Sequence, residues 1–312
     1  MELRHGLDSL PRGDGSTVAT VGFFDGVHLG HRAVFERVVE VARDRGLVSA
    51  VVTFDRHPRE VLTPGQEPRL LTTLERKATL IDATGVDAMV VLEFTEEFSR
   101  WPAEEFVRCV LADGLRAGHV VVGANFTFGH KAMGTVDMLR ELGPKHGFTA
   151  EEVPILELDG RPTSSSSIRE ALSRGDLSWP ARALGRRYAV EGTVVAGAGR
   201  GAGLGFPTAN LETWPRLLLP GAGIYAGRAG IGHPEHVAAI SVGTNPTFGH
   251  EPLHVEAYLL DFHGELQGDE LTVEFWARLR DEQRFDSPRA LAEAMAEDVR
   301  RTRELVPSPE AA

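Results

Sequence analysis

The 312-residue chain lacks the features that mark secreted and membrane proteins. Its single cysteine, Cys109, cannot form an internal disulfide, so nothing indicates a disulfide-stabilised secreted domain. No apolar run approaches the ~18 residues that a membrane span needs. The N-terminus lacks the apolar region of a signal peptide. We therefore expect a cytoplasmic protein with no membrane partner.

Basic residues are also scarce. The chain has 33 Lys and Arg against 45 Asp and Glu, a formal net charge of -12, which argues against a general nucleic-acid-binding surface. None of the three lysines (Lys77, Lys131 and Lys145) follows a glycine, so a P-loop is excluded. The glycine-rich run 197–201 leads to Pro207 instead of a helix, which excludes a dinucleotide-binding loop. Any nucleotide-binding site in this chain must therefore be built from other motifs.

The first half of the chain alternates between two patterns. Strand-like runs lie at 17–24, 48–54, 86–94 and 119–123, and helix-like segments at 29–46, 74–84, 102–113, 135–142 and 168–174. This alternation is typical of right-handed βαβ units. It predicts an α/β domain with a parallel sheet covered by helices on both faces.

The second half has short strand-like runs broken by Gly and Pro, at 188–196, 223–230, 237–242, 254–262 and 271–276. They predict an antiparallel β-barrel. A terminal helix is expected at 288–305, with Ser287 as N-cap and Pro288 in the first turn. Because the pattern changes over 175–187, we predict domains at 1–183 and 184–306 and a flexible tail at 307–312.

The turn at residues 22–31 carries the strongest chemical signal. It follows a predicted parallel strand and opens a helix, whose free N–H groups favour phosphate. His28 and His31 share one side of the first helical turn, and Gly30 allows close approach of a phosphate. Two imidazoles there would stabilise negative charge on a phosphorane. The structural alternative is two solvated histidines with Asp25 as a helix cap.

Two further segments suit phosphate or base binding. Residues 161–169 combine serine hydroxyls with Arg169 one turn into a helix, which is either a phosphate clamp or a Ser-rich linker with an N-cap. Asn125 follows an apolar strand and is a candidate for binding a base or phosphate. The phenylalanines beside it would line a flavin slot or belong to the core.

A second constellation lies in the predicted barrel. Thr208 and Asn210 present neutral oxygens on one side of an extended segment, and such oxygens suit Mg²⁺ shared with ATP phosphates. Glu256 is the one acidic residue of an otherwise apolar strand. It is either an outward-facing strand residue or a base that accepts the proton of a primary alcohol.

These motifs occur in the order of the bacterial bifunctional riboflavin kinase/FAD synthetase family, which the chain resembles from about Val21 to Val299. Residues 28–31 resemble the HxGH signature of nucleotidylyltransferases. Residues 164–169 resemble Ser-Ser-Thr-x-Ile-Arg with Ser166 in the threonine position. Residues 205–210 resemble the kinase signature Gly-Phe-Pro-Thr-Ala-Asn.

The resemblance implies a Rossmann-like nucleotidyltransferase that converts FMN and ATP to FAD, and a barrel that phosphorylates riboflavin to FMN with ATP and Mg²⁺. It implies that the catalytic residues are His28, His31, Arg169 and Glu256. It implies ATP- or FMN-binding roles for Phe24, Asp25, Gly26, Gly30, Asn125, Arg161, Ser164, Ser165, Ser166, Gly205, Pro207, Thr208 and Asn210. Thr208 and Asn210 would also hold the metal.

Two departures leave alternatives open. Ala202 stands where the family has arginine, which Arg200 would replace, and Gln267 stands where it has tyrosine. The nearest alternative is a monofunctional FAD synthetase with a flavin-binding barrel. Two further alternatives are a flavin-sensing regulatory protein and a nucleotidyltransferase for another phosphate. The expected partners are riboflavin, FMN and ATP, and the sequence leaves a homo-oligomer open.

Overall fold

A computed structural model describes residues 1–6, 17–197, 202–244 and 253–307. The chain divides into two compact units, Met1–Ser165 and Ser166–Ala312, called here the first and second unit. The predicted boundary at residue 183 stays a prediction. Most of the predicted tail and residues 198–201 and 245–252 lie outside the described residues. Within the described ranges, no helix has the length and apolar character needed to cross a membrane.

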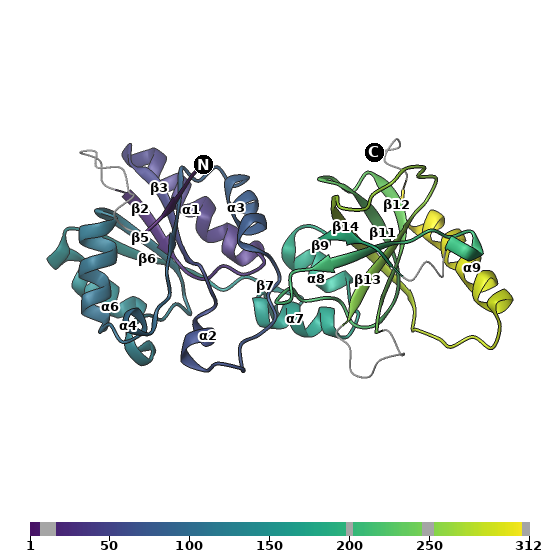
Figure 1. The fold of residues 1–312 in the computed structure, drawn as a ribbon. Helices are drawn as coiled ribbons and strands as arrows, with labels where there is room; N and C mark the ends of the chain where they lie inside the picture. The colour runs from purple at the N-terminus through teal and green to yellow at the C-terminus, as the bar shows by residue number, and fades with distance from the viewer. Residues whose placement is uncertain (7–16, 198–201, 245–252, 308–312) are drawn as a thin grey trace. The chain divides into compact units, whose positions relative to one another are not determined.

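The first unit is built on a six-stranded parallel sheet (Figure 1). Its strands are β1 (Glu2–His5), β2 (Thr17–Val21), β3 (Val48–Phe54), β4 (Ala88–Leu92), β5 (Ala117–Gly123) and β6 (Thr149–Val153). All neighbouring pairs are parallel, in the order β1-β4-β3-β2-β5-β6. The strand order changes direction at β2, which has β3 on one side and β5 on the other. Ligands of open α/β sheets bind at the carboxyl ends of strands at such a point.

Helices cover both faces of this sheet, as predicted. They are α1 (Leu29–Arg45), α2 (Pro58–Leu62), α3 (Leu74–Asp82), α4 (Glu96–Ser99), α5 (Ala103–Phe106) and α6 (Val136–Leu142). On one face Ala50 packs in a cluster with Phe106. On the other, Val51 packs with Phe35 of α1 and Ile81 of α3. Consecutive strand residues thus enter opposite cores, which explains the unbroken apolar strands.

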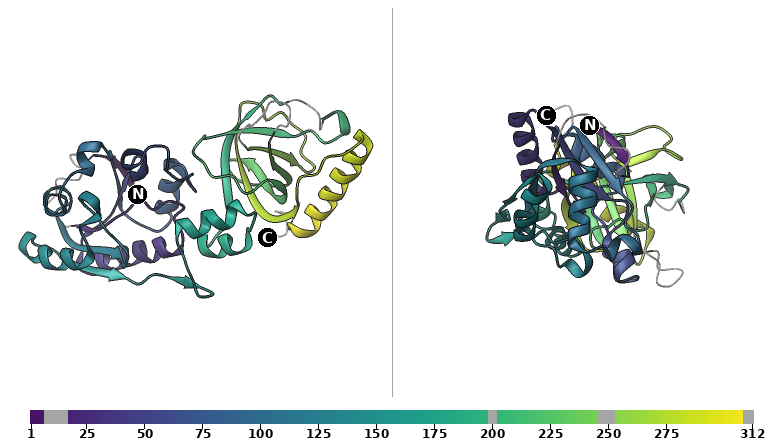
Figure 2. Two further views of the ribbon diagram at one scale, coloured as in Figure 1. Left: turned by 90° about the horizontal axis from the view of Figure 1, so that it is seen from below. Right: turned by 90° about the vertical axis from the view of Figure 1, so that its left-hand side faces the viewer.

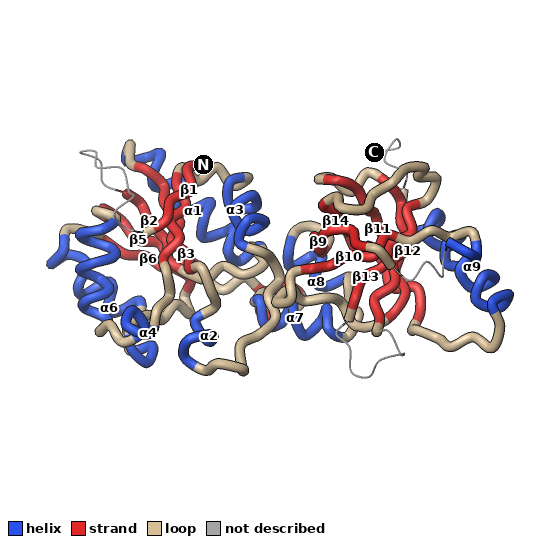
Figure 3. The backbone as a smooth tube through the Cα atoms, viewed as in Figure 1, coloured by secondary structure: helices blue, strands red, loops and turns tan. Residues whose placement is uncertain are grey.

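The second unit contains the predicted antiparallel barrel. Helices α7 (Ser165–Ser173) and α8 (Ser178–Leu184) precede it. The strands are β9 (Tyr188–Val195), β10 (Ala209–Thr213), β11 (Gly223–Ile231), β12 (His236–Gly243), β13 (His254–Leu259) and β14 (Glu270–Arg280). They close in the order β10-β13-β12-β11-β14-β9 (Figure 3). Helix α9 (Pro288–Leu305) lies against the outside of the barrel (Figure 2), and Ser287 caps it by accepting from the Ala290 N–H at 3.2 Å.

Some elements differ from the prediction. Edge strands β1 and β6 of the sheet, β10 of the barrel and helix α8 were not predicted. The predicted helix at 102–113 is α5 followed by a π-helix, Val107–Gly114. Its wider turns end with the Leu115 N–H donating to the Val110 carbonyl at 2.9 Å. The boundary errors elsewhere amount to a few residues at each end.

Candidate functional sites

The turn between β2 and α1 has an unusual backbone. Phe24 and Val27 have φ angles of 54° and 42°, in the left-handed region that non-glycine residues rarely adopt. Gly26 between them has φ of 79°. Such conformations persist where the surroundings determine them fully, and they cluster at functional sites.

The structure brings the two predicted histidines together. The buried His28 is the N-cap of α1, and its Nδ1 accepts from the His31 N–H at 3.3 Å. The two rings stack with centroids 3.5 Å apart. A Cβ on Gly30 would lie 3.2 Å from the His28 ring, so a larger residue there would press against this ring. The structural alternative with Asp25 as the helix cap is wrong, because His28 fills that position.

Asp25 anchors the turn instead. Its carboxylate is buried and accepts from the Leu71 N–H at 2.9 Å and the Thr72 N–H at 3.2 Å. The Gly26 N–H donates to the Thr72 hydroxyl at 3.2 Å. On the other side of the turn, the Ser165 hydroxyl donates to the Asp25 carbonyl at 2.9 Å. The side chain of Asp25 therefore holds backbone, and its predicted contact with ligand stays a prediction.

Sequence reasoning missed one buried charge beside this turn. Lys77 of α3 is 2% exposed, and its ammonium group donates to the Phe23 carbonyl at 2.7 Å. Burial lowers the pKa of Lys77 to about 8, against an opposing attraction from Asp25. The sequence carried one signal for it, a lysine in a chain that has only three.

The remaining predicted residues of this site lie on separate elements. Asn125 is exposed and follows β5, which neighbours β2 in the sheet. Phe128 is buried and packs against Phe106 in the core of the first unit, and a flavin slot beside it stays a prediction. Arg161 begins β8 (Arg161–Pro162), which pairs with β7 (Glu157–Leu158), and Ser164 follows it. Ser166 and Arg169 lie on α7 in the second unit, and their roles stay predictions.

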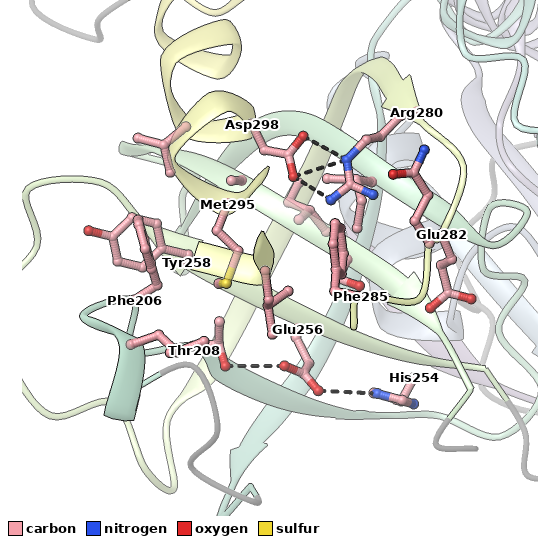
Figure 4. A pocket seen from close by; sticks show the side chains of 18 of the residues that line it. Phe206, Thr208, His254, Glu256, Tyr258, Arg280, Glu282, Phe285, Met295 and Asp298 are labelled. Carbon is pink, nitrogen blue, oxygen red and sulfur yellow. Dashed lines mark hydrogen bonds and ion pairs between the residues drawn. The ribbon is translucent and has the colours of Figure 1, made fainter. Parts of the chain in front are cut away.

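A cavity of about 510 Å³ opens in the second unit, between the barrel and α9 (Figure 4). Glu256 of β13 faces this cavity, and each of its carboxylate oxygens has a polar side-chain partner. The Thr208 hydroxyl donates to Oε2 at 3.2 Å, and His254 Nε2 lies 3.2 Å from Oε1. Glu256 is opposite Asn210 in one strand pair and opposite Ser241 in the other. It alternates with the fully buried Val255 and Ala257, so it lies on the outer face of the barrel as an outward-facing strand residue would, and this face lines the cavity.

The residues predicted to hold Mg²⁺ also line this cavity. Because the Thr208 hydroxyl donates its proton to Glu256, its oxygen lone pairs remain able to accept a hydrogen bond or to coordinate a cation. The Asn210 amide nitrogen donates to the Thr208 carbonyl at 3.4 Å, which leaves the Asn210 carbonyl oxygen as an acceptor. A Cβ on Gly197 would lie 2.0 Å from this amide, so a larger residue there would displace the Asn210 side chain. Two neutral oxygens fit a cation that phosphates also hold. Gly205 (φ 89°) and Pro207 are exposed in the turn before β10.

The opposite wall of the cavity was not predicted. Arg280 at the end of β14 forms a two-pronged ion pair with the buried Asp298 of α9, with nitrogen–oxygen distances of 2.7 and 2.9 Å. The Phe285 ring lies beside the Arg280 guanidinium, 5.7 Å from centroid to Cζ. This pair attaches α9 to the barrel at the cavity.

The two departures from the kinase pattern have different positions. Gln267 is exposed in the turn between β13 and β14 and does not line the cavity. Ala202 begins a short 3₁₀ turn, and Arg200 lies outside the described residues. The departure at Gln267 therefore does not change the lining of the described cavity.

Comparisons with known proteins match both units. Residues 11–167 match the family described as FAD synthetase, and residues 184–306 match the riboflavin kinase family. The bifunctional riboflavin kinase/FMN adenylyltransferase of Pseudomonas fluorescens is 39% identical over 98% of each chain. That of Listeria monocytogenes is 36% identical over 96% of each. A solved Streptococcus pneumoniae structure, described as a macrolide-efflux protein, is 28% identical, with a TM-score of 0.88 over 97% of this chain and 99% of that one.

Proposed function

Because the chain belongs to the bifunctional riboflavin kinase/FMN adenylyltransferase family, we propose that it makes FAD from riboflavin in two ATP-dependent steps. The observation that carries the first step is the cavity in which Glu256 is held between Thr208 and His254. The observation that supports the second is the stacked pair His28 and His31 at the switch point of the parallel sheet.

In the barrel, the terminal hydroxyl of riboflavin attacks the γ-phosphorus of ATP. The new bond joins that oxygen to phosphorus, the bond to ADP breaks, and Glu256 accepts the hydroxyl proton. Thr208 and Asn210 hold Mg²⁺, which neutralises phosphate charge when bound. The cavity of about 510 Å³ is within the range of small-ligand sites.

In the first unit, a phosphate oxygen of FMN attacks the α-phosphorus of ATP and pyrophosphate leaves. His28 and His31 donate hydrogen bonds to the phosphate oxygens on which negative charge builds, and we expect Arg169 of α7 to contribute to the same stabilisation. Asn125, Arg161 and the serines at 164–166 position the nucleotide and FMN. We expect a cytoplasmic enzyme without nucleic-acid or membrane partners, and the oligomeric state is left to experiment.

The test is product analysis by chromatography, with reactions started from riboflavin and from FMN in the presence of ATP and Mg²⁺. We expect Glu256→Gln to lower FMN formation by about 100- to 10,000-fold, because the base is lost, and to spare FAD formation from supplied FMN. We expect His28→Ala to lower FAD formation from FMN and to spare FMN formation from riboflavin.

Three results would contradict this proposal. Equal damage to both reactions by both variants would mean that the two sites are not separate. FAD formed only from FMN would mean a monofunctional enzyme with a flavin-binding barrel. Flavin binding without ATP consumption would mean a sensor.

A further inference from the structure

We propose that Lys77 is a positioning residue for adenylyl transfer, whose buried ammonium group fixes the turn that carries His28 and His31. The proposal rests on the adenylyl-transfer function proposed above. It concerns a residue that belongs to neither the histidine motif nor the serine motif.

The ammonium group of Lys77 joins the carboxyl ends of two neighbouring strands. It donates to the Phe23 carbonyl just after β2, at 2.7 Å, and lies 3.3 Å from the Thr53 hydroxyl on β3. The Thr53 hydroxyl itself donates to the same carbonyl at 3.0 Å. The ammonium nitrogen also lies 3.9 Å from the centroid of the Phe23 ring. The residue before the left-handed Phe24 is therefore held through both its carbonyl and its ring.

A second anchor comes from the same segment of chain. Leu71 and Thr72 hold Asp25 through their N–H groups, and Thr73 caps α3 by accepting from the Arg76 N–H at 3.1 Å. Residues 71–77 thus hold the turn at two points, once before Phe24 and once after it. A backbone with two left-handed non-glycine residues needs such support. The position of His28 depends on this support because it ends the same turn.

The surroundings of Lys77 indicate a role beyond packing. Among the residues that the structure describes, the ammonium group contacts two neutral oxygens and an aromatic face, and no carboxylate lies within hydrogen-bond distance of it. Burying a charge without a direct counter-ion is costly, and an unbranched apolar side chain would fill the same space at lower cost. A lysine at this position lowers the free energy of unfolding relative to an apolar side chain, and it supplies a fixed positive charge and two directed hydrogen bonds.

The charged groups around Lys77 are few. Asp25 in the turn is the acidic group that acts on its pKa, and the effect of burial is larger. His57, after β3, contacts the edge of the Phe23 ring. Asp55 and Arg56 form an ion pair with each other at 2.7 Å. The ammonium group is therefore the charge that a change of pH near 8 would remove from this position.

The test is Lys77→Met in the full-length protein. We expect FAD formation from FMN to fall about 10- to 100-fold, chiefly in kcat, because the histidines lose their exact placement. Riboflavin phosphorylation by the same protein should be unchanged, and the thermal midpoint should be kept or raised. The matched control is Lys145→Met, which removes an exposed lysine paired with Glu141 on the surface.

The pH profile separates positioning from a merely structural role. The adenylyl-transfer rate of the wild type should fall above about pH 8, where Lys77 loses its proton, and Lys77→Met should lack this decline. Thr53→Val, which removes the hydroxyl shared by Lys77 and Phe23, should lower FAD formation from FMN several-fold and leave riboflavin phosphorylation unchanged.

The possible failures are distinguishable. No FAD from FMN in the wild type would overturn the proposed function itself. An active wild type with an equally active Lys77→Met would overturn only the role of Lys77. A Lys77→Met variant with both activities lost and a lowered thermal midpoint would show that Lys77 is a structural residue. Unchanged FAD formation in Thr53→Val would show that the contact between Lys77 and the Thr53 hydroxyl has no role.

Discussion

Glu256 has a different partner on each carboxylate oxygen. His254, two residues earlier on β13, faces the same side of the strand and reaches Oε1, while Thr208 reaches Oε2. With a partner on each oxygen, the plane of the carboxylate is fixed. In this arrangement His254 acts through Glu256, as a residue that positions the base.

Replacement of His254 tests this arrangement. We expect His254→Ala to lower kcat for FMN formation by about tenfold, in line with the loss of one hydrogen bond to a charged group. His254→Gln, which keeps a donor, should restore part of the rate. FAD formation from supplied FMN, measured on the same samples, is the control. Wild-type kinetics in His254→Ala would contradict the role.

At the scale of elements, a buried ion pair helps to dock α9 on the barrel. Asp298 is 4% exposed and binds Arg280 of β14 through two oxygens, at the wall of the cavity. Removing one member of a buried pair leaves the other charge without compensation. The pair therefore couples the docking of the last helix to the shape of the kinase cavity.

Asp298→Asn should lower the free energy of unfolding of the second unit by about 3–5 kcal/mol and reduce riboflavin phosphorylation. Urea denaturation and the product assay measure the two effects. Glu297→Gln is the matched control, because Glu297 pairs with Arg300 on the exposed side of the same helix and should change neither. An equally stable Asp298→Asn would mean that the other contacts of α9, among them the exposed Arg303–Asp261 pair, are enough to dock it.

The elements predicted correctly have strong local signals. Helix α9 was predicted over its full length because Ser287 and Pro288 mark its start and its apolar residues recur at helical spacing. Strands β1 and β6 were missed because they are edge strands with exposed charged residues such as Glu2 and Glu152, which break the apolar pattern. Local sequence does not show that a polar segment completes a sheet formed elsewhere.

The same limit applies to the sites. The closeness of His28 and His31 follows from their spacing, but the stacking of their rings was not predicted. The contacts of Asp25 with Leu71 and Thr72 span about 46 residues, and those of Lys77 with Phe23 span 54. These partners are neighbours only because β2 and α3 pack in one unit. No spacing rule along the chain places them together.

At the scale of the whole chain, the segment 166–183 decides where the kinase unit begins. Its contacts within the second unit are specific. The Gly221 N–H, in the loop before β11, donates to the Leu172 carbonyl at 2.9 Å. A Cβ on Gly175 would lie 2.7 Å from the Arg278 side chain. Ile168 and Leu172 are fully buried. These contacts favour a folding unit that starts near residue 166 over one that starts at 184.

Two fragments test this reading. We expect residues 166–312 to be more stable than residues 184–312 by about 2–5 kcal/mol, because the shorter fragment loses buried apolar side chains such as Ile168 and Leu172 and the Gly221 hydrogen bond. Both should phosphorylate riboflavin at low temperature, since the cavity and Glu256 lie beyond residue 184. Urea unfolding followed by far-UV circular dichroism measures the difference. Equal stability would show instead that the barrel folds without α7 and α8, and that the domain begins at 184 as the change in sequence pattern predicts.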